Sequence, residues 1–468
     1  MVMVSYTRAT LVALFVWIAS PYRPTIKGAL LTIMSWYKQL QRLRLRLLND
    51  TVEDEAHRNL VSGRTWETFC ETLKVAGTAI IQHGTPKDPV SQAEGYRYLS
   101  RLLRVSLEAF VECNDPEFPT LVALSNGSRV ARVCIGSDNP DNLYLSATID
   151  ARNDYVVRGT RGTVHYLGFG TQAGGYGQPG GLSTVDYKEA NELTLNLHLK
   201  QDQIVLYLSR NEPTDPVQRA NWLRLDPTIN PHVLIVRNTF IDRTIEVPSK
   251  LTIHKMKTNN RKMLGDQSSS SSGNDKIAGS ISCKELEDGL ATAGMFVAAT
   301  PLLFCNWANG FQKHVNTLPL FDQITSNKMG GDPNIRYYHS AWKIEKNEVL
   351  VIDAIPPICD TWNIQINNYW MESLDYRYHT IHTNKGLATY QDNQKSKVRI
   401  IVAHQIDATI KNVTWLSCCG RTEGTMCFRW IKPRDESGQM YPPNDASMPN
   451  PTCRIVSFEE LPMIDAVK

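Results

Sequence analysis

The segment WNIQINNYW, residues 362–370, alternates apolar and polar side chains over its first six positions. Successive side chains of a β-strand point to opposite faces of the sheet, so this pattern predicts a strand with one apolar face and one amide face. The apolar face consists of Trp362, Ile364 and Ile366, and the amide face of Asn363, Gln365 and Asn367. We expect the apolar face to be buried and the amides to form an exposed ladder beside the tryptophans.

Short runs of this kind, rich in β-branched and aromatic residues, recur through the chain between Gly, Pro, Asn and Asp. They lie at 143–150, 155–159, 162–169, 193–199, 203–209 and 232–240, and again at 337–344, 349–355, 397–405, 425–431 and 453–458. Half-buried antiparallel strands account for them. Helical spacing occurs at 52–83, 91–113 and 283–315, while the Gly-rich 168–181 is predicted to be a loop.

The predicted fold class is therefore α+β, with N-terminal helices followed by two mainly antiparallel modules of β-sandwich or jelly-roll type. Composition suggests the boundaries, because the Ser-rich segment KTNNRKMLGDQSSSSSGNDK is typical of a linker. The predicted divisions are an apolar and basic segment at 1–50, a helical layer at 51–120, a first β-sandwich at 121–256, a linker at 257–280, and a helix with a second β-sandwich at 281–468.

The N-terminal segment has a composition of its own. No Asp or Glu precedes Asp50, whereas seven Lys and Arg residues do. The apolar stretch ATLVALFVWIA at 9–19 fits a signal-peptide core but is short of the roughly 20 residues that span a bilayer. Leu and Arg alternate at 38–48, which suits a basic helix on anionic lipid. Three alternatives stay open: a signal anchor or membrane-attached segment, a cleaved secretory signal, and a helix hairpin packed on the protein itself.

Cysteine, histidine and sequon patterns add little chemistry. The ten cysteines contain no CxxC pair, so a zinc ribbon is not predicted, and disulfides are permitted without being required. His379 and His382 are three residues apart, and on a strand such side chains point to opposite faces, so we predict no metal site. Asn126 and Asn412 are glycosylation candidates if the chain enters the secretory pathway.

The segment SDNPDN at 137–142 is rich in turn-forming residues. Asx side chains bond backbone amides, and Pro140 keeps its predecessor out of the helical region, so we predict turns and inter-strand ties rather than a reactive site. The spacing of its acids does not fit an EF-hand calcium loop. Asp150 is expected to pair with Arg158 or Arg161 across neighbouring strands.

Eight stretches together resemble proteins that contain the domain of unknown function 1214. They are EGYRYLSRLLR (94–104), SDNPDNLYLSATID (137–150), RGTRGTVHYL (158–167), RANWLRLDP (219–227), VRNTFIDR (236–243), GGDPN (330–334), NNYWMESLDYR (367–377) and EGTMCFRW (423–430). The resemblance covers roughly residues 55–460. It implies a two-layer β-sandwich or jelly-roll fold and brings no settled biochemical activity with it.

Function is predicted from the second module, where aromatic residues crowd. Core packing is the favoured interpretation of these rings, and a ligand surface is the alternative. The candidate ligand-binding residues are Trp362, Asn363, Gln365, Trp370, Glu372, Asp375, Arg377 and His404.

We expect a non-enzymatic binding or scaffold protein that is membrane-associated, in the secretory pathway or extracellular. It would have protein partners in an assembly, contact a membrane surface through its N-terminal segment, and need no cofactor. The alternatives are a carbohydrate-active enzyme or other hydrolase, and a lipid-binding protein. A net charge of +3 on 468 residues predicts no nucleic-acid partner.

Overall fold

The computed structural model describes residues 50–125, 133–174, 182–193, 202–228, 232–256, 277–328 and 331–461. Four sequence-based predictions therefore lie outside the described residues. They concern residues 1–49 of the predicted N-terminal segment 1–50, the sequon at Asn126, residues 194–199 of the strand-like run 193–199, and residues 257–276 of the predicted linker 257–280.

The described elements confirm the α+β class with β-sandwich-like modules. The helices are α3 (Val52–Val61), α4 (Arg64–Ile81), α5 (Pro89–Leu107), α6 (Pro216–Ala220), α7 (Cys283–Phe311) and α8 (Gln323–Lys328), with short turns η1 (Glu108–Glu112), η2 (Ala190–Glu192) and η3 (Gln312–His314). The strands of the first module are β1 (Val122–Ser125), β2 (Asn142–Ile149), β3 (Tyr155–Thr160), β4 (Tyr166–Gly174), β5 (Leu182–Glu189), β6 (Gln203–Ser209), β7 (Trp222–Arg224), β8 (His232–Thr239) and β9 (Lys250–Lys255). Those of the second are β10 (Ile335–Lys343), β11 (Glu348–Ala354), β12 (Thr361–Asn367), β13 (His382–Asn384), β14 (Val398–Ala403), β15 (Thr414–Ser417), β16 (Glu423–Ile431) and β17 (Thr452–Ser457).

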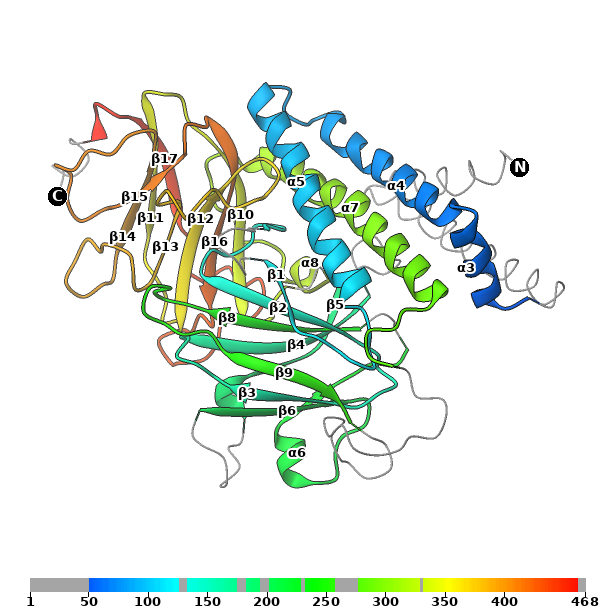
Figure 1. Ribbon diagram of the computed structural model, residues 1–468. Helices are drawn as coiled ribbons and strands as arrows, with labels where there is room; N and C mark the ends of the chain where they lie inside the picture. Colours follow the sequence, from blue (N-terminus) through cyan, green and yellow to red (C-terminus); the bar gives the residue numbers. More distant parts are fainter. Residues whose placement is uncertain are drawn as a thin grey trace.

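The first sandwich packs the sheet β1-β2-β8-β4-β5 against the sheet β7-β6-β3-β9. Every strand pair in it is antiparallel except β6 with β7. Strand β6 shows why the layers form, because its alternate residues Ile204, Leu206 and Leu208 are buried in the core between the sheets. The modules lie one beside the other, with the first sandwich in the lower half of the view (Figure 1).

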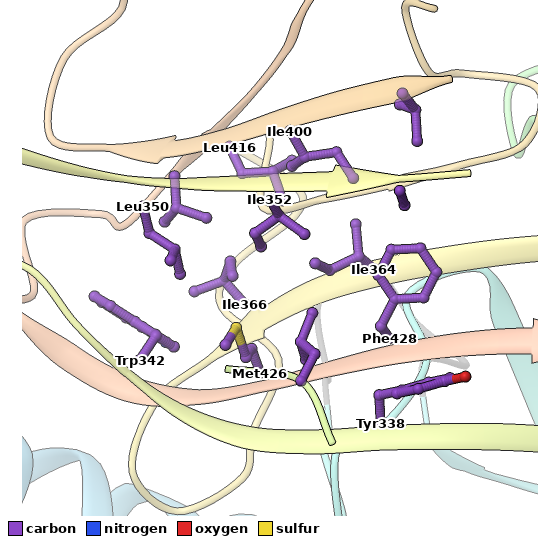
Figure 2. Packing of buried hydrophobic residues seen from close by; sticks show 14 of the residues in the cluster. Tyr338, Trp342, Leu350, Ile352, Ile364, Ile366, Ile400, Leu416, Met426 and Phe428 are labelled. Atoms are coloured by element: carbon purple, nitrogen blue, oxygen red, sulfur yellow. The ribbon is translucent and has the colours of Figure 1, made fainter. Parts of the chain in front are cut away.

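The second sandwich packs the sheet β10-β16-β12-β13 against the sheet β15-β14-β11-β17. Its core combines aliphatic residues of β11 and β14 with aromatic residues of β10, β12 and β16 (Figure 2). Trp362, Ile364 and Ile366 of β12 all point into this core. The apolar face predicted from the alternation in 362–367 is confirmed.

Helices cover the outer face of the second sandwich. Helix α7 packs against α3, α4 and α5 (Figure 1). Helices α4, α5 and α7 form a third core with residues of β10 and of the segment after β12. Each of α3, α5 and α7 begins at a side chain that caps its free backbone amides: Thr51, Asp88 and Ser282. The predicted helix at 52–83 is interrupted at Gly63, which has a φ of 76°.

Helix α7 is unusually apolar. The stretch Cys283–His314 is long and apolar enough to cross a bilayer by length and composition, and it is the one such helix among the described residues. However, 67% of its most apolar window is buried inside the protein. Packing between helices and sheet accounts for this apolar composition.

The prediction of a loop at 168–181 is wrong over its first half. Residues 168–174 belong to β4, a fully buried strand hydrogen-bonded to β5 and β8. Glycine is needed here for packing: a Cβ at Gly168 would lie 1.9 Å from the hydroxyl oxygen of Tyr187. At Gly168 the glycine therefore reflects close approach within a sheet rather than a turn.

Candidate functional site

The amide face of β12 is buried, which corrects the expectation of an exposed ladder. The 137–142 loop of the first module lies against it and takes up all three amides. The bonds run from Asn363 to the Asn139 side chain, from Gln365 to the Asp138 carbonyl at 2.6 Å, and from Asn367 to the Ser137 hydroxyl at 3.1 Å. We call this contact the polar layer, because it joins the two sandwiches through polar groups.

A buried cation, Arg429 of β16, completes the polar layer. Its guanidinium donates to Gln365 Oε1 at 2.6 Å and to the carbonyl of Ser137. The same group lies 5.7 Å from the ring centre of Tyr337. A buried guanidinium needs such acceptors, since an unpaired polar group in the interior costs several kcal/mol.

The acids of the 137–142 loop make structural bonds to the second module. Asp138 accepts from the amide of Ser373 at 3.0 Å and from its hydroxyl at 2.8 Å. Asp141 accepts from Asn384 at 3.0 Å and lies 3.1 Å from Nε2 of His382. The predicted role in turns and ties is confirmed, with the addition that the ties join two modules.

The predicted partner of Asp150 is wrong. Its carboxylate pairs with Arg152 in the turn between β2 and β3. Arg158 lies within β3, and Arg161, just after the end of β3, donates instead to two backbone carbonyls.

Three other predicted site residues are buried in structural contacts. Trp362 is fully buried in the second sandwich core. Trp370 donates its indole N–H to the carbonyl of Ser91 in α5 at 2.8 Å. Glu372 is 1% exposed and pairs with Arg101 of α5 at 2.5 Å. The last two residues hold the helices on the sandwich.

Asp375, Arg377 and His404 do not take part in the buried contacts of Trp362, Trp370 and Glu372. Asp375 and Arg377 pair with each other at 2.7 Å. His404 Nδ1 lies 3.2 Å from the sulfur of Cys418. Burial raises the pKa of the Cys418 thiol, which opposes formation of a nucleophilic thiolate. Of the eight predicted residues, Asn363 and Gln365 are therefore the two that take part in the polar layer.

Of the histidine pair, only His382 lies on a strand, at the start of β13, whereas His379 lies in the bend before it. His379 is exposed, whereas His382 faces Asp141. Within the described ranges, no group of three or more His, Cys, Asp or Glu side chains could hold a metal ion. All ten cysteines are described, and all are free.

A cleft of about 370 Å³ opens between the two sandwiches. This volume lies within the range of small-molecule sites. From the first module come Arg161, His165, Tyr166, Leu167, Glu189, Ala190 and Asn191, and from the second come Cys359, Asp360 and Lys385. We call this the inter-sandwich cleft.

Both carboxylates of the cleft are paired with cations of the second module. Lys432 contacts Glu189, which is 2% exposed, and lies 4.0 Å from Asp360. Arg434 pairs with Asp360 at 2.7 Å. Lys432 adopts a φ of 52°, a left-handed conformation that is uncommon for a residue with a side chain. These pairs neutralise the acids and link the modules at the cleft.

Two cations of the cleft have no such partner. Arg161 donates to the carbonyls of Val164 and His165 at 2.8 and 3.3 Å, and Lys385 donates to that of Cys359 at 2.8 Å. Among the residues that the structure describes, no carboxylate lies within ion-pair distance of either cation. The cleft therefore carries an excess of positive charge with unused N–H donors.

Burial changes the acidity of two cleft residues. It raises the pKa of Glu189, and the ammonium of Lys432 opposes that shift. It also raises the pKa of the Cys359 thiol to about 11, so this thiol is protonated at neutral pH. Neither group is therefore poised as a free nucleophile.

Sequence reasoning missed most of this cleft. Arg161 was noted only as a strand-pairing residue, and Glu189, Asp360, Lys385 and Lys432 were not noted at all. These five residues come from five separate loops and strand ends, with no shared spacing. The only hint was that Lys432 directly follows the strand-like run at 425–431.

Comparison with known proteins gives one informative relative. No protein-family model and no curated protein matches the sequence. The crystal structure of the VPA0106 protein from Vibrio parahaemolyticus is 10% identical, with a TM-score of 0.40, and the match covers 82% of this chain and 100% of that one. The crystal structure of an uncharacterized protein from Burkholderia cenocepacia is 38% identical, with a TM-score of 0.72, and the match covers 86% of this chain and 99% of that one. With this identity over nearly the whole of the relative, the chain belongs to the same protein family as the Burkholderia cenocepacia protein.

Proposed function

We propose that this chain is a non-catalytic binding protein that holds a small anionic ligand in the inter-sandwich cleft. One observation carries the proposal: Arg161 and Lys385 line the cleft without a carboxylate partner, while Glu189 and Asp360 are already neutralised. A ligand with a carboxylate or phosphate group would restore the charge balance.

The donors that remain free suit such a ligand. A guanidinium has five N–H donors and an ammonium has three. Arg161 uses two of them on the carbonyls of its own loop, and Lys385 has carbonyl contacts at 2.8 and 3.4 Å. The carbonyls hold both side chains in place, and each keeps donors for an anion. Such preorganisation lowers the entropy cost of binding.

The paired state of the acids supports binding over hydrolysis. Hydrolysis by two carboxylates needs one as an acid and the other as a base or nucleophile, each with access to substrate. Glu189 contacts Lys432, and Glu372 is buried against Arg101, so both are committed to structural ion pairs. Membership of the domain of unknown function 1214 group, membrane association through residues 1–49, and glycosylation at the exposed Asn412 remain predictions.

The test is calorimetric titration of the purified protein with inorganic phosphate, succinate and glucuronate, with neutral glucose for comparison. A bound anion should also raise the unfolding free energy, by about 2.7 kcal/mol at a concentration 100-fold above Kd. Arg161→Gln combined with Lys385→Gln should weaken binding at least tenfold. Arg210→Gln combined with Lys346→Gln removes the same charge from exposed sites outside the cleft and should not.

The proposal fails if no anion binds. It also fails if the cleft variant, Arg161→Gln with Lys385→Gln, binds an anion as tightly as the parent protein and the control variant do. Binding should also weaken with rising salt concentration, because the cleft is open to solvent and its charges are screened.

A further inference from the structure

Exposed aliphatic side chains lie in segments that adjoin cleft-lining residues, one segment in each module. The first module contributes Ile245 and Val247, which are 77% and 48% exposed, from the loop between β8 and β9. The second contributes Ile355 and Ile358, which are 58% and 56% exposed, from the segment IPPI between β11 and β12. We call these four side chains the aliphatic rim.

Backbone contacts fix the first side of the rim beside Arg161. The amide of Thr163 donates to the carbonyl of Val247 at 2.9 Å, and the amide of Val247 donates to the Thr163 hydroxyl at 2.8 Å. Gly162, between Arg161 and Thr163 in the chain, has a φ of 68°, and a Cβ at this position would lie 2.3 Å from the carbonyl oxygen of Val247. The two loops are thus in direct contact, and Val247 lies next to the segment that carries Arg161.

The second side of the rim is fixed in the same way. Ile358 directly precedes Cys359 and Asp360, both of which line the cleft. Its carbonyl accepts from the amide of Arg434 at 2.6 Å, and Arg434 in turn pairs with Asp360. Two prolines separate Ile355 from Ile358 and restrict the backbone, so this side is preorganised.

Single exposed aliphatic residues are ordinary on protein surfaces. Here, however, Val247 contacts the segment that carries Arg161 and Ile358 directly precedes Cys359, so both lie next to a cleft with an excess of positive charge. We propose that the ligand is an amphiphilic anion, whose carboxylate or phosphate headgroup binds Arg161 and Lys385 while its hydrocarbon chain lies on the aliphatic rim. This inference rests on the proposed anion-binding function and adds the chemical class of the ligand.

The experiment compares headgroups with and without a hydrocarbon chain. The probes are inorganic phosphate with butyl, hexyl and octyl phosphate, and acetate with butyrate, hexanoate and octanoate, all below their micelle concentrations. Burial of one methylene contributes about 0.8 kcal/mol, or roughly a fourfold gain in affinity. On an open rim the burial is partial, so we expect a gain of about two- to fourfold per methylene.

Val247→Ser combined with Ile358→Ser should flatten this dependence on chain length and leave the affinity for inorganic phosphate or acetate unchanged. Ile81→Ser combined with Ile406→Ser is the matched control, because both residues are similarly exposed and neither lines the cleft. Circular dichroism and thermal unfolding would show that all variants are folded.

The two proposals fail in different ways. If the short anions bind and the longer chains bind no better, the amphiphile inference is overturned and the anion site stands. If none of the probes binds, or if octyl phosphate binds equally well after Arg161→Gln with Lys385→Gln, both are overturned.

Vesicles distinguish the source of the headgroup. Co-sedimentation with phosphatidylcholine vesicles that contain phosphatidate, reduced by the cleft and rim variants, would identify the headgroup of a bilayer lipid. Binding of the soluble esters alone would identify a free amphiphile. Either result supports the proposal. The proposal would be contradicted if the soluble esters did not bind and the variants left co-sedimentation with the vesicles unchanged.

Discussion

Gln365 is the residue through which the polar layer is most directly tested. Its side chain is fully buried, and its Nε2 donates to the Asp138 carbonyl at 2.6 Å and to Asn367 Oδ1 at 2.7 Å. Its Oε1 accepts from Arg429 at 2.6 Å. Gln365→Leu keeps a similar volume but removes all three bonds and leaves their partners buried.

The magnitude follows from these bonds. A hydrogen bond to a charged group contributes about 1.5–3 kcal/mol, and each neutral one contributes about 1 kcal/mol. Gln365→Leu should therefore lower the unfolding free energy by about 3–5 kcal/mol. For about 400 residues, with an unfolding entropy of roughly 2 cal/mol/K per residue, this corresponds to a decrease in Tm of about 5 °C.

Scanning calorimetry is the suitable assay, because a protein with two sandwiches need not unfold in a single two-state step. The variant should shift the transition and separate the unfolding of the two modules. Gln394→Leu, at an exposed position, should change stability by less than about 0.5 kcal/mol.

A double variant sharpens the argument. Gln365→Leu with Arg429→Met removes the buried charge together with its acceptor, so the combined loss should be smaller than the sum of the two single losses. If Gln365→Leu shifts Tm no more than Gln394→Leu does, the polar layer does not hold the modules together and the reasoning is refuted.

Two further predictions concern the helical side of the molecule. Burial lowers the pKa of His339 to about 3, whereas the pKa of a histidine in the unfolded chain is about 6.5. The contribution of His339 to the unfolding free energy is therefore fully present above pH 6.5. It is lost as the pH falls toward 3, by up to about 1.4 kcal/mol per pH unit. His339→Phe should flatten the loss of stability between pH 6.5 and 4 in urea titrations, whereas His379→Phe, at an exposed position, should leave it unchanged. A Cβ at Gly95 in α5 would lie 2.6 Å from the ring of Trp370, so Gly95→Ala should lower the unfolding free energy by about 1–3 kcal/mol. A Cβ at Gly77 in α4 would meet open space, so Gly77→Ala should raise the unfolding free energy by about 0.5–1 kcal/mol. Equal shifts for the two glycine variants in thermal unfolding would contradict the packing argument.

Local pattern predicted many of the strands but missed six, and it did not predict what covers them. The missed strands are β1, β5, β7, β9, β13 and β15. The alternation in 362–367 correctly assigned the two faces of β12, because the side-chain period of a strand is local geometry. Whether the amide face meets solvent depends on a loop more than 200 residues away in sequence, at 137–142. The polar composition of this face predicted exposure to solvent, but the polar 137–142 loop of the first module buries it.

The same limit explains the error at Gly168. Glycine is read as a turn residue because of its conformational freedom, yet this glycine makes room for Tyr187 within the sheet. The cleft could not be predicted from the sequence for a related reason. Arg161, Asp360 and Lys385 become neighbours only when the sandwiches pack, and no spacing in the chain indicates that they do.

The polar layer and the inter-sandwich cleft are two parts of one contact between the modules. Arg429 binds the first module within β16, and Lys432, three residues later in the chain, contacts Glu189 at the cleft. Hydrogen bonds require particular distances and angles, whereas apolar surfaces tolerate sliding. A polar contact therefore sets the relative position of the sandwiches more narrowly than an apolar one of equal area. That precision is what a site divided between modules needs, because Arg161 and Lys385 reach a common ligand only at one spacing. We therefore expect that loosening the layer would weaken anion binding without any change to a cleft residue.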